Sequence, residues 1–205
     1  MKVELIKYTP DPDKTCAAAA LSCHSHKSSG ELIEGLSEEK NKSILGETIR
    51  KGHHSVIEHA SFTFSVSGVS RALTHQLVRH RIASYSQQSQ RFVKLEEPTF
   101  VIPPSIREDS KSLREYNKFM ENAWNLYGSL LERKIPKEDA RFVLPNATTT
   151  NITITMNARE LIHFFKLRCS TDAQWEIRGM AWKMFEKVKK VAPIIFENVE
   201  LPNDL

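Results

Sequence analysis

The stretch TTTNITITM, residues 148–156, decides the fold class of this chain of 205 residues. Threonine and isoleucine alternate in its second half, which is typical of a β-strand with two different faces. Helical patterns follow at once, one from Ala158 and one from Asp172. Strands and helices alternate along the chain without a regular βαβ rhythm or a Gly-rich phosphate loop. We therefore expect an α+β fold, with a mostly antiparallel or mixed sheet packed with helices.

The rest of the chain supports this mixture. Ser61–Val66 places three large apolar side chains on one face, and Pro193 is expected to end the last long helix. Residues 1–205 are expected to form a single domain, which suits the length of the chain. Strands are predicted at residues 3–5, 61–66 and 91–95, and helices at residues 15–23, 38–51, 69–80 and 110–133 and in a short segment after Pro136. Ser37 is expected to cap the helix at 38–51. The helix at 110–133 carries an apolar stripe: Leu113, Tyr116, Met120, Trp124, Tyr127 and Leu131.

The composition is that of a soluble globular protein. The formal net charge is +4 with a pI near 8.9, which suits an anionic small molecule as well as a nucleic acid. No apolar run is long enough to span a bilayer. Cys16, Cys23 and Cys169 are odd in number and lack metal-site spacing, so we expect reduced thiols and a cytoplasmic location.

The most basic stretch is RHRIASYSQQSQR, residues 79–91. No acidic residue occurs between Glu58 and Glu96, so the sequence offers this stretch no nearby carboxylate. If the helix runs to His80, then Gln76, Arg79 and His80 share one of its faces. One interpretation is an ordinary basic last turn that complements the helix dipole. The other is a site for an anionic ligand.

A second polar cluster lies in NARELIHFFKLR, which begins at Asn157. Asn157 is predicted to cap a helix, with Glu160 completing a capping box. Arg159 and His163 are four residues apart and should project together. Arg168 falls on the apolar stripe, where an unpaired guanidinium is costly. It therefore snorkels to solvent, pairs with a carboxylate or meets an anionic ligand.

Two further patterns raise the question of other chemistry. The histidines of GHHSVIEH, residues 52–59, lack the spacing of known zinc-binding helices, so we predict no metal site. Ser84, Ser86 and Ser89 lack the elbow motif that surrounds a serine nucleophile. Hydroxyl groups between arginines are better suited to donate hydrogen bonds to a phosphate.

These residues together resemble the flavin-dependent thymidylate synthases. The family signature is RHR, seven residues and then Ser, which here is Arg79-His80-Arg81 followed by Ser89, with Arg91 two residues later. The resemblance covers nearly the whole chain. Its other blocks, in the same order as in the family, are GHHSVIEHASFTF, RFVLPNAT, MNAR and LRCSTDAQWEIR.

The resemblance implies a specific reaction. The family methylates dUMP to dTMP, with 5,10-methylenetetrahydrofolate as carbon donor, NADPH as reductant and FAD as hydride carrier. It also implies a homotetramer with active sites at subunit interfaces, and neither nucleic acid nor a membrane as partner. No covalent protein nucleophile would be needed, since flavin and folate carry the difficult chemistry.

The resemblance also implies site residues. Arg168 would be catalytic, because a guanidinium beside the pyrimidine stabilises developing negative charge by about 4 kcal/mol at 4 Å and an effective dielectric of 20. His53 would border the folate pocket. The dUMP site would use Gln76, Arg79, Gln87, Gln88, Ser89, Gln90, Arg91, Arg141 and Arg168. The FAD site would use Ser55, Glu58, Arg79, His80, Arg81, Gln87, Asn157, Arg159 and His163.

The chain departs from the family pattern in places. Many relatives have Glu where this chain has Gln87 and Gly where it has Gln90, which leaves the polar contacts near dUMP open. Ala20 precedes Ser22 where an Arg is common. Two other functions also remain open: a nucleic-acid-binding module that uses residues 71–91 as a basic patch, and a His-rich metal hydrolase.

Overall fold

The computed structural model describes residues 1–197 and 199–201. These residues form two compact units. Unit 1 comprises residues 1–2, 66–77 and 86–152, and unit 2 comprises residues 3–65 and 78–85 with the described residues from 153 on. The prediction of one domain over residues 1–205 stays a prediction.

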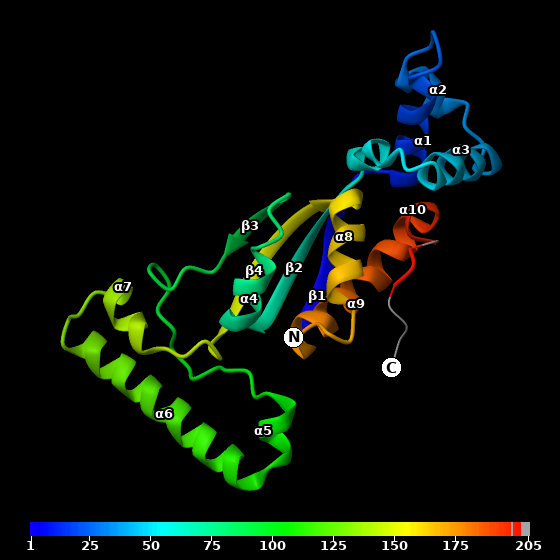
Figure 1. The fold of residues 1–205 in the computed structure, drawn as a ribbon. Coiled ribbons are helices and arrows are strands. Elements are labelled where there is room, and N and C mark those ends of the chain that lie inside the picture. The colour runs from blue at the N-terminus through cyan, green and yellow to red at the C-terminus, as the bar shows by residue number, and fades with distance from the viewer. Residues whose placement is uncertain (198, 202–205) are drawn as a thin grey trace. The chain divides into compact units, whose positions relative to one another are not determined.

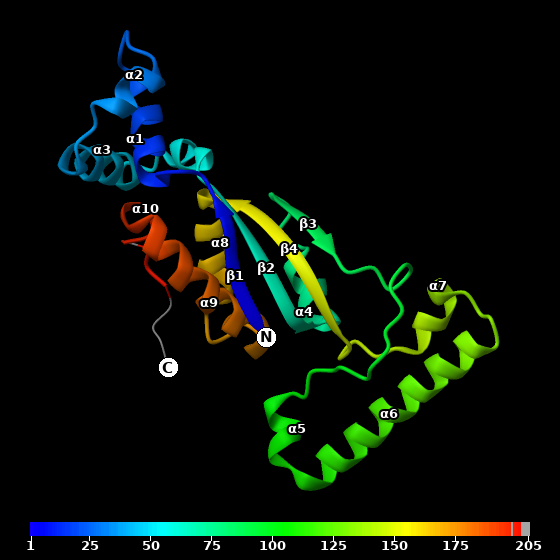
Figure 2. The same ribbon diagram turned by 180° about the vertical axis from the view of Figure 1, so that it is seen from behind.

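The chain forms a four-stranded sheet (Figure 2). Neighbouring strands are antiparallel: Thr9 N–H donates to Ser61 O at 3.0 Å, and the hydroxyl groups of Thr63 and Thr155 lie 3.0 Å apart across the next pair. The predicted α+β fold is therefore confirmed. The strand order is β1 (Lys2–Tyr8), β2 (Ser61–Ser70), β4 (Thr149–Asn157) and β3 (Ala83–Gln87).

Alternation along the strands separates a core face from a polar face. Phe62 and Phe64 of β2 and Ile154 of β4 are fully buried. Side chains of successive strand residues point to opposite faces, so Thr63 and Thr155 lie on the other side, where their hydroxyl groups interact. The alternation of Thr and Ile in the sequence thus correctly predicted a strand with one apolar face.

Unit 2 packs its helices around an aromatic core. The Phe165 and Phe185 rings are 5.3 Å apart, and Phe196 lies 6.0 Å from Phe165 and 5.8 Å from Phe62. Figure 1 shows α8 and α9 alongside β1. The helices of unit 2 are α1 (Pro12–Ser22), α2 (Ser29–Glu34), α3 (Glu38–Arg50), the 3-10 helix η1 (His54–His59), α8 (Ala158–Arg168), α9 (Trp175–Val191) and α10 (Pro193–Glu197).

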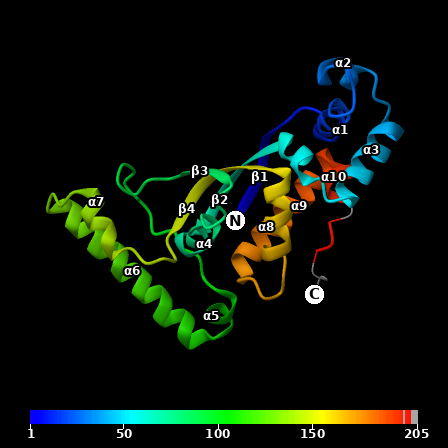
Figure 3. The ribbon, with the colours of Figure 1, turned by 45° about the horizontal axis from the view of Figure 1, so that its top comes forward.

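Unit 1 is built around the long helix α6 (Ser110–Glu132), with α5 and α7 at its opposite ends (Figure 3). Its buried stripe consists of Met120, Ala123, Trp124 and Tyr127. The predicted 110–133 helix and the short helix after Pro136 are confirmed. The other helical segments of this unit are α4 (Arg71–Leu77), α5 (Pro104–Glu108), α7 (Lys137–Ala140) and the 3-10 turn η2 (Arg141–Val143).

The helix α3 begins and ends at the capping residues that the sequence contains. Ser37 accepts a hydrogen bond from the Lys40 N–H and begins α3, as predicted. The helix ends at Arg50, and Gly52 follows with φ of 80°, a conformation that glycine adopts without strain.

Three predicted elements need correction. The helix predicted over residues 69–80 is only α4, because β2 continues to Ser70. Residues 91–95 form a turn rather than a strand, and the third strand to appear in the chain is instead β3. The last long helix starts at Trp175 rather than at Asp172. Pro193 follows the end of that helix but also begins α10, since proline is well suited to the first turn of a helix.

In the part of the chain that the structure describes, no helix has both the length and the apolar character needed to cross a bilayer.

A buried carboxylate joins α1 to α10. Asp13 accepts hydrogen bonds from the Ile194 and Ile195 N–H groups at 2.9 and 3.1 Å. We expect Asp13→Ala to lower the free energy of unfolding by about 2 kcal/mol, because two N–H groups lose a charged acceptor. Urea unfolding followed by tryptophan fluorescence measures this. Asp172→Ala, in an exposed loop, is the control and should change little.

Candidate functional site

Unit 2 contains an open pocket of about 640 Å³. This volume lies within the range of sites that bind small molecules and cofactors. The wall is formed by the segment between α4 and β3, by η1 and by α8. Seven of the nine residues predicted to contact FAD line it: Glu58, Arg79, His80, Arg81, Asn157, Arg159 and His163.

The N-terminal end of α8 positions several side chains of the pocket wall. Asn157 accepts the Glu160 N–H at 2.9 Å and begins the helix, as predicted. The predicted capping box is wrong, because the Glu160 carboxylate is directed to His80 and not back to the Asn157 backbone. Arg159 and His163 both line the pocket, one turn apart.

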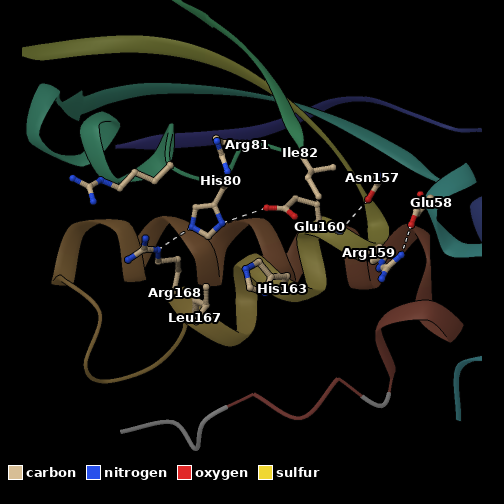
Figure 4. Close-up of a pocket in the computed structure, with 11 residues that line it drawn as sticks. Glu58, His80, Arg81, Ile82, Asn157, Arg159, Glu160, His163, Leu167 and Arg168 are labelled. Carbon is tan, nitrogen blue, oxygen red and sulfur yellow. Dashed lines mark hydrogen bonds and ion pairs between the residues drawn. The ribbon is translucent and has the colours of Figure 1, made fainter. Parts of the chain in front are cut away.

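His80 occupies a central position among these side chains (Figure 4). Its ring is buried, with Nε2 accepting a hydrogen bond from Arg168 Nε at 3.1 Å and Nδ1 lying 3.4 Å from Glu160 Oε1. The ring packs edge-on against Phe164, with centroids 4.9 Å apart. Burial, and then the positive charge of Arg168, lower the pKa of His80 to about 4. At neutral pH the ring is therefore uncharged, and its contact with Glu160 is not an ion pair.

The surroundings of His80 are also buried. Tyr85 donates a hydrogen bond to the His80 carbonyl at 2.8 Å and so fixes the backbone at this point. Burial raises the pKa of Tyr85, and the Glu160 carboxylate adds to the effect. Burial also raises the pKa of Glu160.

The pKa of His80 predicts a pH dependence of stability. The unfolded chain binds the proton near the ordinary pKa of 6.5, whereas the folded protein binds it only near 4. Stability therefore falls as the pH drops from about 6.5 towards 4, by about 2.5 kcal/mol at pH 4.5. The free energy of unfolding in urea should be measured at pH 7.5 and at pH 4.5 for the wild type and for His80→Gln. We expect the decrease between the two pH values to be smaller in His80→Gln by about 2.5 kcal/mol. Replacing the exposed His26 by Gln is the control.

The open side of the pocket is cationic. Arg159 Nη1 lies 2.6 Å from Glu58 Oε1, so the charge of one arginine is already matched. Arg79 and Arg81 are exposed and take part in no ion pair within residues 1–197 and 199–201. A ligand with negative charge would find unmatched guanidinium groups here.

Unit 1 holds a second polar cluster. The Ser89 hydroxyl accepts the Arg91 N–H at 3.2 Å, and Arg91 Nε lies 2.5 Å from Glu138 Oε2. Arg141 Nε donates to the Glu138 carbonyl at 3.0 Å. The fold thus supplies from α7 the carboxylate that the basic stretch lacks in sequence. It also links three residues predicted to bind dUMP.

Arg71 is a neighbour of this cluster that the sequence did not single out as a site residue. Its Nη1 donates to the Gln88 carbonyl at 3.2 Å. Burial lowers its pKa, and the nearby charge of Arg141 adds to this. Arg71 is the first residue of α4, and the start of this helix pairs with residues 146–148, which are far away in the sequence. No local sequence signal therefore indicates that Arg71 is half-buried beside Arg141.

A second cavity in unit 2, of about 420 Å³, lies between α1, α3 and the start of η1. It is lined by His53, predicted to border the folate pocket, and by Ser55, predicted to contact FAD. Ser55 is therefore not in the pocket with the other residues predicted to contact FAD.

No described group of three or more His, Cys, Asp or Glu side chains has an arrangement that could hold a metal ion. Cys16, Cys23 and Cys169 form no disulfide bond with one another. Burial raises the pKa of Cys16 to about 12, so this thiol stays protonated and is a poor nucleophile.

Comparison with known proteins identifies the relatives of this chain. A family model described as thymidylate synthase complementing protein matches residues 4–194. The chain belongs to this family. Its resemblance to the flavin-dependent thymidylate synthases is therefore confirmed.

Several curated relatives carry the name flavin-dependent thymidylate synthase. The protein of Geobacter sulfurreducens is 50% identical over 200 residues, which cover 97% of this chain and 86% of the relative. That of Clostridium tetani is 49% identical, covering 96% and 86%. That of Pyrococcus horikoshii is 50% identical, covering 95% and 83%.

In this member of the thymidylate synthase complementing protein family, the residues predicted to bind dUMP belong to both units. Arg79 and Arg168 line the pocket of unit 2. The prediction that Gln76, Arg79 and His80 share a helix face is wrong, because α4 ends at Leu77. Unit 1 carries Gln76, Gln87, Gln88, Ser89, Gln90, Arg91 and Arg141.

Gln87 and Gln90 are the positions where this family member departs from many relatives. Gln87 is predicted to contact both dUMP and FAD, yet its amide already donates to the hydroxyls of Thr74 and Thr150 at 3.0 and 3.3 Å. Gln90 is buried. Both side chains therefore contribute to the packing of unit 1, whatever they contact in a complex.

Arg168 follows neither of the first two alternatives drawn from the sequence, and the third, contact with an anionic ligand, stays a prediction. It neither extends into solvent nor pairs with a described carboxylate, but donates to a neutral histidine. Of its five N–H donors, only the one on Nε has a partner among the described residues.

Proposed function

We propose that this protein is a methyltransferase that converts dUMP to dTMP, with 5,10-methylenetetrahydrofolate as carbon donor, NADPH as reductant and FAD as cofactor. The observation that carries the proposal is the pocket of unit 2. It gathers the RHR signature and the polar side chains of α8 in a chain about half identical to flavin-dependent thymidylate synthases.

The residues of this pocket suit a flavin nucleotide. FAD carries a pyrophosphate, and Arg79 and Arg81 offer exposed guanidinium groups without carboxylate partners among the described residues. Asn157 and His163 add polar side chains, and Ile82 adds an apolar surface for a ring system. When bound, FAD would supply hydride chemistry that no side chain can provide.

Arg168 has the role of stabilising charge on the pyrimidine. Activation of the pyrimidine for carbon transfer at C5 would place negative charge on the ring, and a guanidinium held beside it would lower the energy of that state. The Nη groups of Arg168 are available for this contact, since only Nε is used within the described part of the protein.

The dUMP phosphate would be bound by the cluster around Ser89, Arg91 and Arg141. Charge-assisted hydrogen bonds to phosphate contribute about 1.5–3 kcal/mol each, so a few of them give micromolar-scale affinity. Glu138 now neutralises Arg91, and we propose that the phosphate competes with this carboxylate for the arginine.

We further propose a cytoplasmic homotetramer whose active sites are completed between subunits. The family resemblance supports the assembly, and three cysteines without a disulfide bond suit a reducing compartment. Sedimentation equilibrium of the purified protein tests the tetramer directly.

The test of the whole proposal is the visible absorption spectrum of the purified protein. We expect a flavin spectrum that NADPH bleaches and that dUMP with methylenetetrahydrofolate restores in the absence of oxygen, with dTMP as product. If the protein binds no flavin even in excess FAD, the proposed function is wrong. Bleaching without recovery would remove the methyl-transfer half of it.

Replacement of Ser89 tests the phosphate site. We expect Ser89→Ala to weaken dUMP binding about tenfold while some activity remains, because the hydroxyl donates to the phosphate and forms no covalent bond. Isothermal titration with dUMP and a steady-state assay measure the two effects. Ser43→Ala, exposed on α3, is the control. Complete loss of activity with unchanged dUMP binding would instead indicate a serine nucleophile.

A further inference from the structure

Three residues of α8 form a row beside the pocket, and the first and last of them line it. Glu160, Phe164 and Arg168 are separated by four residues each, so they lie on one face of the helix. The first and last Cα atoms of this row are about 12 Å apart along the helix axis. Glu160 and Arg168 form no ion pair with each other in the structure, and each contacts His80 instead.

The His80 ring fills the space between them. It stands edge-on over Phe164, with an angle of 79° between the rings, and turns one nitrogen towards each end of the row. Figure 4 shows the imidazole between the carboxylate of Glu160 and the guanidinium of Arg168. The residue is only 5% exposed, so water does not replace either partner.

The contact with Arg168 determines where the histidine proton lies. Arginine is a donor only, so the Nε2 atom that accepts its Nε–H must be unprotonated. A neutral imidazole then carries its proton on Nδ1, which faces the Glu160 carboxylate at 3.4 Å. In water, free histidine favours the opposite tautomer, with the proton on Nε2. The buried carboxylate is the group that reverses this preference.

We propose that Glu160 and His80 are positioning residues that act in series on Arg168. Glu160 holds His80 in the Nδ1–H tautomer, and Nε2 of His80 fixes the guanidinium through Nε. The Nη groups, which have no partner among the described residues, are thereby left for the ligand. The role of Arg168 towards the pyrimidine rests on the proposed function, whereas the tautomer does not.

The arrangement explains why His80 is suited to this position. A charged imidazolium would repel Arg168 and could not accept its hydrogen bond. Burial and the neighbouring guanidinium keep the ring neutral at the pH where the protein works. His80 lines the pocket, but both of its ring nitrogens face other side chains, so we do not expect them to contact a ligand.

The direct test is the histidine ¹⁵N spectrum of the substrate-free protein at pH 7.5. We expect one histidine with a protonated Nδ1 and an unprotonated Nε2, whose signals disappear in His80→Gln. In Glu160→Gln the same signals should shift towards the other tautomer, because the amide can also donate to Nδ1. A proton on Nε2 in the wild-type protein, or a doubly protonated ring, would overturn the proposal.

Two substitutions of His80 distinguish its contact with Arg168 from its contact with Glu160. The Gln carbonyl can reach the position of Nε2 and accept from Arg168, whereas the shorter Asn can only replace Nδ1 and donate to Glu160. We expect His80→Gln to retain at least tenfold more of the wild-type kcat than His80→Asn. Equal losses in both variants would show that the Arg168 contact does not matter.

Kinetics of Glu160→Gln provide the last comparison. We expect kcat for dTMP formation to fall about tenfold, with a smaller change in the KM for dUMP and unchanged flavin content, as for other residues that orient a functional group. Glu186→Gln, exposed on α9, is the matched control. An unchanged kcat in Glu160→Gln would contradict the proposal. If the wild-type protein makes no dTMP, the proposed function fails, while the ¹⁵N spectrum still decides the tautomer.

Discussion

Arg168→Ala is expected to abolish most thymidylate formation while the protein keeps its flavin. The loss in kcat should be about 10²–10³-fold, the range measured when one fixed donor to a developing anion is removed. Flavin is retained because the other arginines of the pocket, Arg79, Arg81 and Arg159, remain in place.

The measurement is single-turnover dTMP formation together with the flavin absorbance of the purified variant. Arg114→Ala, exposed on α6, should match the wild type. Arg168→Lys tests whether charge alone is enough. It should recover little activity, since an ammonium group cannot both donate to His80 and present a planar pair of donors to the pyrimidine. Wild-type turnover in Arg168→Ala would remove this residue from the reaction.

Phe165→Ala is expected to have the largest effect on stability. Its ring is fully buried and contacts the rings of Phe164, Phe185 and Phe196, which come from three helices. Removing a buried aromatic ring of this kind costs about 3–5 kcal/mol, which is a large part of the stability of most domains.

Thermal and urea unfolding of the two proteins give the difference. Phe119→Ala is the matched control, because Phe119 lies on α6 with 60% of its surface exposed and should change stability by no more than about 0.5 kcal/mol. A loss below about 1 kcal/mol in Phe165→Ala would show that the cavity collapses or fills with water.

The sequence predicted those parts of the fold whose signals are local. The caps Ser37 and Asn157, the stripe of α6 and the alternation of β4 depend on neighbours a few residues away, and each was confirmed. The strand β3 was missed because ASYSQ has no apolar alternation, and its partners come from distant β4.

The same reasoning applies to the site. Arg159 and His163 were predicted to project together from helical spacing, and the family resemblance added Asn157 to the same site. The structure places all three in one pocket. The burial of His80 and its two partners could not be predicted, because they depend on how the segment after α4 packs on α8. Glu160 was interpreted as a capping residue since that is its usual local role. The row it forms with Phe164 and Arg168 was visible in the spacing, but nothing in the sequence shows what lies over the row.

The pairing of β2 with β4 has a consequence for the synthesis of the protein. Thr63 and Thr155 are neighbours in the sheet but 92 residues apart in the chain. At about 5–20 residues per second, a ribosome needs about 5–20 s to deliver the second partner after the first. During this time the edge of β2 that pairs with β4 is without its partner, and unit 2, which is made of three separate stretches, cannot close. We therefore expect the nascent chain to depend on chaperones during this interval, and no single contiguous fragment to reproduce the pocket.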